Sequence, residues 1–566
     1  MLSDATVPDV AETAETPGSG HLAGPPAWAR ALIVIGGGIL TFLAFPPLGW
    51  WFTAPFGVAL LFFGLYGAGL RRAAWLGYLG GAAFLFPAMA WVRPIGDDAW
   101  LALVAIESAF WAVMAVAAVL VMRLRLWPLW VACLWVAQEW ARGQFPVGGF
   151  PWARLAFSQG DSPYTGHAAL GGAPLVTFTV VLSGSLISFL LVRGLPRPAW
   201  NRQVALILAG AVALPVLGLL VPRPGDEGKA LRVGVVQGSV PGRGLGWAGN
   251  EPAVVLKNHA DETHRLAAAV RAGELPKPDI VVWPENSTDI DPYRNAAAYQ
   301  TIDAAVKDVG VPVLVGAVVS IGAESRATRA VVWDPVTGPG AYYDKQKLVP
   351  FGEFTPYKEI VLALFERANL VGRQSVPGSE DGDLRVGPVT VGAVSCYEVA
   401  FDQIVRGTVR AGGSPLVVQT NNATYELTNL PPQQLAMSQL RAVEHNRAVI
   451  AVATTGISAY VSPDGTVQWQ TAELVPDRTV VTVPVRTANT LATRVGGWPE
   501  LLLILMGAAA TMVAAGAAWR QRESRRDGRA AQDDVPGEHS QGHGQSEGDG
   551  RLRSQGQSQG HSQGLD

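Results

Sequence analysis

The sequence predicts a membrane α-helical bundle of about eight transmembrane helices joined to an extracytoplasmic α/β domain. Hydrophobic residues make up 49% of the 566 and charged residues only 16%, whereas soluble domains carry roughly 25% charged residues. Long apolar runs fill residues 31–221, and one more lies at 499–519. Residues 230–488, between them, have ordinary charge density and many short β-like runs. These observations together indicate a membrane protein with one globular domain outside the bilayer.

The two ends of the chain are predicted to be disordered cytoplasmic tails. Residues 1–29 are polar, acidic and rich in Pro and Gly, and they lack the basic start of a secretory signal peptide. Residues 520–566 are rich in Gly, Gln, Ser and His, with "SQG" recurring. Such compositions cannot bury enough apolar surface to fold.

The bundle is predicted within residues 30–229, with the last helix at 499–519. A helix needs roughly 20 apolar residues to cross a bilayer, and several runs reach that length. The fifth run is the least certain, because it is short and carries Gln138 and Glu139. The apolar runs of the bundle lie at 31–48, 52–70, 73–92, 100–122, 127–143, 168–192 and 204–221.

Arginines orient the predicted spans. Basic residues concentrate in cytoplasmic loops, and here they follow the second, fourth, sixth and eighth spans. The intervening connections, such as "GDDAW" at 96–100, are poor in Lys and Arg. Both chain ends are therefore expected in the cytoplasm and residues 230–488 on the opposite side. The arginines are Arg71, Arg72, Arg123, Arg125, Arg193, Arg197, Arg202, Arg520, Arg522, Arg525 and Arg526.

The globular segment is predicted to be a single α/β or α+β domain. Its β-like runs, such as "LRVGVVQGS" and "VTVGAVS", alternate with helical stretches at 252–273 and 431–447. A separate apolar, aromatic loop at 142–160 falls on the outer side, between spans five and six. It is either a packed connection or an interfacial segment that admits a lipid, and the sequence favours neither.

Composition also excludes several classes of function. The net charge of −3 lacks the excess of basic residues that is typical of nucleic-acid-binding proteins. Two cysteines cannot form a disulfide framework, and Cys133 lies in an apolar run where it is expected to pack between helices. The eight histidines are scattered without metal-ligand spacing. We therefore predict neither a metal site nor a cofactor.

Three polar residues follow apolar strands in the globular segment. Glu285 follows the apolar part of "DIVVWPENS", Lys345 follows a hairpin-like stretch, and Cys396 follows "VTVGAVS". Reactive residues gather at the carboxyl ends of strands in α/β sheets, so the three side chains can meet. Together they would supply a base, a cation and a nucleophile. Taken singly, they are equally a loop carboxylate, a solvated charge and a small core hydrophobe.

The stretches "WPENS", "YDKQKLVPFGEF" and "SCYE" resemble the signatures of the apolipoprotein N-acyltransferase family, membrane members of the nitrilase superfamily. The resemblance runs from about residue 31 to 519. It implies an extracytoplasmic α-β-β-α nitrilase-like domain inserted before the last span. It also implies a multi-pass protein of the bacterial plasma membrane.

The same resemblance implies roles for individual residues. Glu285 would be the general base, Cys396 the nucleophile and Lys345 the cation that stabilises the oxyanion, with the backbone N–H of Tyr397 as a second donor. Glu353 would support the lysine and the base.

Four further positions match the family less directly. Tyr397 and Glu398 flank the nucleophile, and Trp247 corresponds to a tryptophan of a mobile loop. In "TNNATYEL" the family often has an aromatic pair, of which Tyr425 is present while Thr424 replaces the other. Tyr425 and Trp247 would therefore be substrate-binding residues.

The implied reaction moves a fatty acyl chain from a phospholipid, through a Cys396 thioester, to the α-amine of a lipoprotein's diacylglyceryl-cysteine. The expected partners are that phospholipid, the apolipoprotein acceptor and membrane lipids, without nucleic acid and with the chain as a monomer. Two alternatives stay open. One is a membrane-tethered amidase of the nitrilase type, which would use the same triad. The other is a non-catalytic scaffold for an enzyme that makes lipid-linked sugars.

Overall fold

The computed structural model describes residues 26–193, 202–222, 224, 228–242, 253–359, 363 and 371–533. Helices lie at every predicted apolar run. They are α1 (Ala27–Leu43), α2 (Thr53–Leu65), α3 (Leu70–Ala88), α4 (Asp97–Val121), α5 (Trp127–Arg142), α6 (Ala168–Arg193), α7 (Arg202–Leu219) and α14 (Trp498–Asp533).

Four helical segments of the described residues are long and apolar enough to cross a membrane, namely Asp97–Val121, Pro163–Arg193, Arg202–Leu219 and Trp498–Asp527. The helices α1 and α2 are apolar but shorter. The chain thus carries several membrane-type helices, and the count of eight spans stays a prediction. Short 3-10 turns connect the bundle, at Ala90–Val92 (η1), Leu155–Ser158 (η2) and Pro163–His167 (η3).

Small residues bring the helices of the bundle close together. A Cβ added to Gly37 in α1 would lie 2.8 Å from the carbonyl oxygen of Gly57 in α2. A Cβ added to Gly57 would lie 2.5 Å from the hydroxyl of Thr41. Only glycine permits this approach of two backbones, the usual way in which membrane helices gain packing energy.

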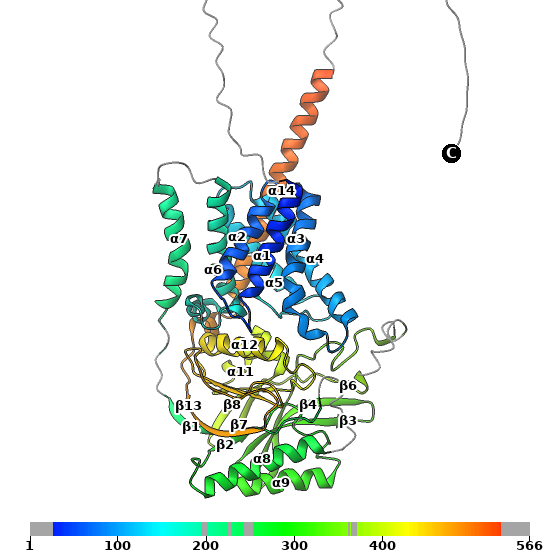
Figure 1. Cartoon of the computed structure of the whole chain (residues 1–566), viewed down its shortest axis with the longest axis vertical. Coiled ribbons are helices and arrows are strands. Elements are labelled where there is room, and N and C mark those ends of the chain that lie inside the picture. The colour runs from blue at the N-terminus through cyan, green and yellow to red at the C-terminus, as the bar shows by residue number, and fades with distance from the viewer. Residues whose placement is uncertain are drawn as a thin grey trace, which may run out of the picture. The chain divides into compact units, whose positions relative to one another are not determined.

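The globular domain contains two sheets, which Figure 1 shows face to face. The seven-stranded sheet has the order β13-β1-β2-β3-β4-β5 with β6 paired to β4, and the six-stranded sheet has the order β12-β11-β10-β9-β8-β7. The strands are β1 (Lys229–Gln237), β2 (Ile280–Val282), β3 (Val313–Ile321), β4 (Ser325–Asp334), β5 (Gly338–Asp344), β6 (Gln374–Ser375), β7 (Asp383–Val386), β8 (Val389–Ser395), β9 (Leu416–Thr420), β10 (Val449–Ala453), β11 (Ala459–Val461), β12 (Val467–Gln470) and β13 (Asp477–Val485).

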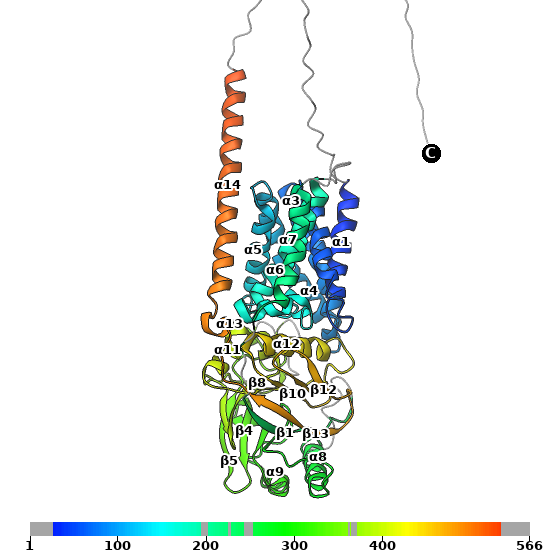
Figure 2. The same cartoon turned by 90° about the vertical axis from the view of Figure 1, so that its left-hand side faces the viewer.

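Helices cover the outer faces of both sheets, which gives α-β-β-α layering. The seven-stranded sheet is covered by α8 (Val254–Arg271) and α9 (Ala296–Val309). The six-stranded sheet carries α11 (Asp402–Arg410) and α12 (Leu430–His445), which lie between that sheet and the bundle in both views (Figure 2). A 3-10 turn, η6 (Cys396–Ala400), precedes α11, and α13 (Leu491–Val495) precedes α14.

The strand burial explains this layering. The strands β2, β9 and β10 are buried at every residue and apolar except for Gln419 and Thr420 in β9, as expected where a sheet is covered on both faces. One hydrophobic cluster fills the space between the sheets, and another lies beneath α8 and α9. A third runs without a break from the bundle into α11 and α12, through residues such as Phe157, Ile404 and Leu440.

The loop at 142–160 is largely packed. All residues of 151–160 are buried, whereas Gln144 and Phe145 are exposed. Trp152 Nε1 donates to Gln433 Oε1 of α12 at 2.7 Å. The packed-connection interpretation therefore fits the second half of this loop, which joins the bundle to the globular domain.

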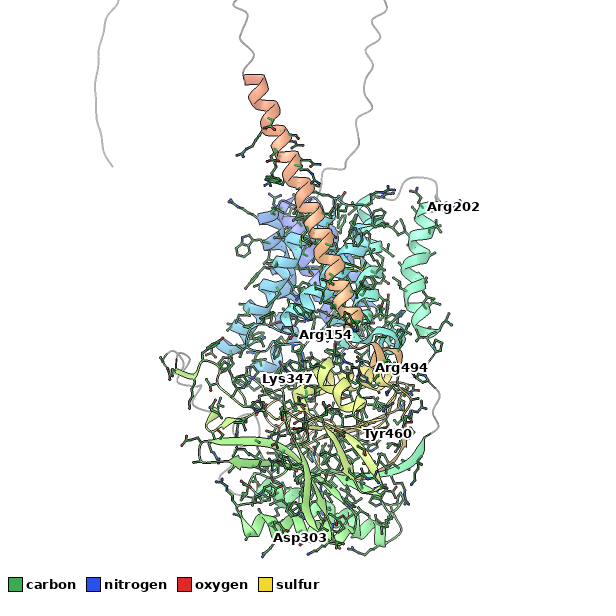
Figure 3. All side chains as sticks on the ribbon, turned by 180° about the vertical axis from the view of Figure 1, so that it is seen from behind. Arg154, Arg202, Asp303, Lys347, Tyr460 and Arg494 are labelled. Atoms are coloured by element: carbon green, nitrogen blue, oxygen red, sulfur yellow. The ribbon has the colours of Figure 1, made fainter. Side chains whose placement is uncertain are left out.

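A buried ion network lies at the same junction, and we call it the junction network. Arg154 Nη1 donates to both carboxylate oxygens of Asp402 at 2.9 Å, and Arg441 Nη2 donates to Asp402 Oδ1 at 2.6 Å. Arg154 also lies 3.8 Å from Glu139 and 3.6 Å from Glu500. Figure 3 labels Arg154 where the bundle meets the domain. The network joins α5, the loop, α11, α12 and α14.

Candidate active site

The three predicted residues come together, but from two sheets rather than one. Glu285 lies three residues after β2 and Lys345 directly after β5, both in the seven-stranded sheet. Cys396 directly follows β8 in the six-stranded sheet. The face-to-face stacking of the two sheets, in the α-β-β-α layering that the resemblance implied, brings their strand ends to a common site.

Glu285 is buried and held at both carboxylate oxygens. Lys345 Nζ donates to Oε1 at 3.0 Å and Ser395 Oγ donates to the same oxygen at 2.6 Å. The backbone N–H of Asn421 donates to Oε2 at 3.1 Å. These donors fix the carboxylate beside the residue that precedes Cys396.

Lys345 is almost fully buried between two carboxylates. Its ammonium lies 3.0 Å from Glu285 and 3.0 Å from Glu353. Burial alone would lower the pKa of Lys345, but Glu285 and then Glu353 keep that pKa well above its usual value. The two carboxylates thus favour the protonated, cationic form of Lys345. Glu353 is itself held by the backbone N–H of Val349 at 2.8 Å.

Cys396 sits at the sharp change from strand β8 to the turn η6. Its φ of 48° is in the left-handed region, which is costly for a non-glycine residue and is found mainly at functional sites. Gln434 Nε2 of α12 donates to Sγ at 3.6 Å. The surrounding protein, and next the negative charge of Glu285, raise the pKa of Cys396 to about 12. Burial thus favours the neutral thiol form of Cys396.

Glu398 links the two halves of the site. Its carboxylate, fully buried, accepts from Tyr343 Oη at 2.9 Å and from the backbone N–H groups of Gln346 at 2.7 Å and Ser395 at 2.8 Å. Burial raises the pKa of Glu398. This one carboxylate thereby ties the segment that carries Lys345 to the turn that carries Cys396.

Tyr397 faces the bundle instead of the triad. Its hydroxyl donates to the carbonyl of Gly149 at 3.1 Å, and its ring stacks on Trp152 with centroids 6.3 Å apart. Tyr425 packs edge-on to Trp91 at the end of the bundle, with centroids 5.3 Å apart. Burial, followed by the nearby Cys396, raises the pKa of Tyr425. An aromatic cluster from the bundle and the globular domain thus adjoins the turn that carries Cys396. Trp247 lies outside the described residues.

Several site residues escaped the sequence analysis. Ser395 immediately precedes Cys396, and its position at the end of β8 was an available signal. Gln434 lies on α12 and Tyr343 in β5, and neither carries a local signal for its contact. No group of three or more His, Cys, Asp or Glu side chains with the arrangement of a metal site occurs among the described residues.

Comparison with known proteins matches both parts of the chain. Residues 37–186 match the model of the apolipoprotein N-acyltransferase N-terminal domain, and residues 232–494 match that of carbon-nitrogen hydrolases. A solved nitrilase-superfamily amidase, a mutant from Nesterenkonia AN1, aligns at 20% identity over 49% of this chain and 97% of its own, with a TM-score of 0.35. That score is too low to support an argument.

Curated relatives extend over most of the chain. The apolipoprotein N-acyltransferase of Pseudomonas putida is 29% identical over 79% of this chain and 89% of its own. The apolipoprotein N-acyltransferase of Mycolicibacterium smegmatis is 39% identical over 85% of this chain and 84% of its own. The chain therefore belongs to the apolipoprotein N-acyltransferase family.

Proposed function

We propose that this chain transfers a fatty acyl chain from a membrane phospholipid to the α-amine of a lipoprotein's N-terminal diacylglyceryl-cysteine. The observation that carries the proposal is the buried contact of Lys345 with Glu285, next to the Cys396 turn. The aromatic cluster that joins this turn to the bundle supports a lipid substrate. Family membership supports the same reaction.

In the first half-reaction, Glu285 takes the proton of the Cys396 thiol, and the sulfur attacks the ester carbonyl of the phospholipid. Lys345, assisted by the backbone N–H of Tyr397, stabilises the tetrahedral oxyanion. The ester C–O bond then breaks, and the leaving glycerol oxygen takes the proton from Glu285. Lysophospholipid departs and the acyl group stays on Cys396 as a thioester.

In the second half-reaction, the α-amine of the diacylglyceryl-cysteine attacks the thioester carbonyl. Glu285 accepts a proton from the amine, and the C–S bond breaks as the amide forms. The same proton returns to the Cys396 sulfur, so the enzyme ends as it began. Glu353 supports this cycle by holding Lys345, and Glu398 supports it by fixing the turn.

The membrane arrangement is part of the proposal. Eight spans would lie in 30–229 and 499–519, with the domain 230–488 on the extracytoplasmic side of a bacterial plasma membrane. The tails 1–29 and 520–566 would be cytoplasmic and the chain a monomer. The arginines that follow alternate spans support this sidedness. We propose substrate-binding roles for Tyr425, supported by its ring contact with Trp91, and for Trp247.

The test is the intact mass of the detergent-purified chain after incubation with phospholipid and no acceptor. We expect a gain of one acyl chain that neutral hydroxylamine removes. Cys396→Ala should abolish the adduct, whereas Cys133→Ala, which removes the other cysteine, should retain it. An adduct missing from folded wild-type protein would refute acyl transfer. Hydrolysis of soluble amides by that protein would then identify the tethered amidase, and inactivity on both would favour the scaffold.

A further inference from the structure

A cavity of about 280 Å³ lies next to the nucleophile turn. Its walls come from the bundle loop at 147–149, from the segment 346–348, and from Tyr397, the residue after Cys396. Pockets that enclose whole drug-sized ligands span roughly 300–1,000 Å³. This cavity is therefore sized for a compact polar group with a short stem, such as a lipid headgroup on glycerol, and is too small for two acyl chains.

Lys347 is the one charged side chain among the described residues that line this cavity. Within the described part of the chain, its ammonium has no carboxylate at ion-pair distance, and it lies 5.3 Å from the ring centroid of Phe401. Lys345, two positions earlier, is by contrast held by Glu285 and Glu353. The Lys347 cation therefore keeps its hydrogen-bonding capacity for an incoming group.

The backbone holds Lys347 at a fixed place relative to the nucleophile. The N–H groups of Gln346 and Lys347 donate to Glu398 Oε1 at 2.7 and 3.0 Å. The other oxygen of that carboxylate accepts from the backbone N–H of Ser395 at 2.8 Å. Figure 3 labels Lys347 at the level where the bundle adjoins the domain. A group bound by Lys347 would thus be positioned with respect to Cys396.

A cation such as the Lys347 ammonium can distinguish the two substrates of the proposed reaction by one feature. The phospholipid donor carries a phosphodiester anion close to its ester bonds, whereas the diacylglyceryl-cysteine acceptor carries no phosphate. A cation beside an aromatic, partly buried wall binds a phosphate oxygen through a charge-assisted hydrogen bond. Resting on the proposed function, we propose that Lys347 binds the headgroup phosphate of the acyl donor and is a donor-specificity residue.

The experiment compares two acyl donors that differ only by the headgroup. Acyl-enzyme formation by the full chain is followed by intact mass in mixed micelles, with subsaturating dioleoyl-phosphatidylglycerol or with dioleoylglycerol. We expect Lys347→Gln to slow acylation by the phospholipid about tenfold, the loss of one charged hydrogen bond, and to leave acylation by dioleoylglycerol unchanged. Lys347→Arg should retain the phospholipid rate. Lys277→Gln, which alters an exposed lysine between α8 and β2, should match wild type with both donors.

A second readout separates binding of the donor from support of the turn. The Lys347→Gln acyl-enzyme made from dioleoylglycerol should pass its acyl group to a diacylglyceryl-cysteinyl peptide at the wild-type rate, because this acceptor has no phosphate. Equal losses with both donors, or a slower transfer to the peptide, would overturn the proposal in favour of a structural role. Equal rates for wild type and Lys347→Gln with the phospholipid would overturn it as well.

Inorganic phosphate tests the other source of the same chemistry. Inhibition of wild type by inorganic phosphate that disappears in Lys347→Gln, with phospholipid rates equal in both, would overturn the headgroup assignment in favour of a free-phosphate site. A wild-type chain that gains no acyl group from either donor would refute the proposed function, and the headgroup site with it. If the folded wild-type chain is acylated but Lys347→Gln, Lys347→Arg and Lys277→Gln all react with the phospholipid at the same rate, the headgroup site alone would be refuted.

Discussion

Replacement of Arg154 by methionine should cost far more stability than replacement of an exposed arginine. Arg154 is 5% exposed and holds the carboxylates of Asp402, Glu139 and Glu500 in the junction network. Methionine occupies a similar volume without charge, so it leaves the buried Glu139 and the partly buried Asp402 and Glu500 undercompensated. Breaking a buried ion pair in this way costs about 3–5 kcal/mol, which corresponds to a folded-to-unfolded ratio lower by roughly two to three and a half powers of ten.

Arg232→Met is the matched control, because Arg232 also pairs with an aspartate. Its guanidinium lies 3.2 Å from Asp279, with side-chain exposures of 44% and 31%. Exposed pairs contribute about 0–1 kcal/mol. Thermal unfolding of both variants and wild type is followed by tryptophan fluorescence in the same detergent. We expect a clearly lower midpoint for Arg154→Met and a nearly unchanged midpoint for Arg232→Met.

A double variant tests the cause of the loss. If uncompensated charge is responsible, Arg154→Met combined with Asp402→Asn should be less destabilised than the sum of the two single losses. Equal midpoints for Arg154→Met and Arg232→Met, or strict additivity in the double variant, would refute the argument that the junction network stabilises the contact of bundle and domain.

Three further predictions concern the site. Alkylation of Cys396 by iodoacetamide in Glu285→Gln protein should accelerate about tenfold per pH unit from about pH 7 to about pH 9, because burial, the largest cause of the raised pKa of Cys396, remains when the charge of Glu285 is removed. Peptide mass spectrometry measures the rate, and a plateau in this range would show that burial does not raise this pKa. Ser395→Ala should slow acyl-enzyme formation about tenfold, because Glu285 loses one donor. Ser395→Thr, which keeps a hydroxyl, should retain the wild-type rate, and an unchanged rate in Ser395→Ala would refute the role of this hydrogen bond. Tyr397→Phe should lower the free energy of unfolding by about 1 kcal/mol through loss of the hydrogen bond to Gly149. The control Tyr460→Phe, which removes a hydroxyl without a hydrogen bond among the described residues, should leave the free energy of unfolding unchanged. Equal thermal unfolding midpoints for the two variants would exclude a stabilising role of the Tyr397 hydroxyl.

The strands and the residues that follow them were predictable because each is encoded locally. Apolar β-like runs ended at polar residues, and strands do end next to Lys345 and Cys396. The pairing of those strands was not predictable, since β8 pairs with β9 across an intervening helix and β1 with β13 across most of the domain. For that reason, the residues alone predicted that the three strand ends could converge, but not which sheet carries each of them.

Contacts between distant segments account for the remaining omissions. Gln434 reaches the Cys396 sulfur from the outer side of the six-stranded sheet, 38 residues along the chain. The contact of Asn421 with Glu285 uses a backbone N–H, which no side-chain pattern can reveal. The short strand β7 was missed because alternating "DLRV" holds too few apolar residues to be distinguished from a loop.

Because one hydrophobic cluster runs without a break from the bundle into α11 and α12, the globular domain depends on the bundle to bury the outer face of these two helices. A soluble enzyme of the same layering would cover these helices with polar residues or with a second subunit. Here the bundle supplies that cover, so an excised segment 230–488 would present Phe401, Ile404 and Leu440 to water. The helical bundle therefore acts as a fifth layer of the catalytic domain. A form of the enzyme without the bundle would need polar residues on the outer face of α11 and α12.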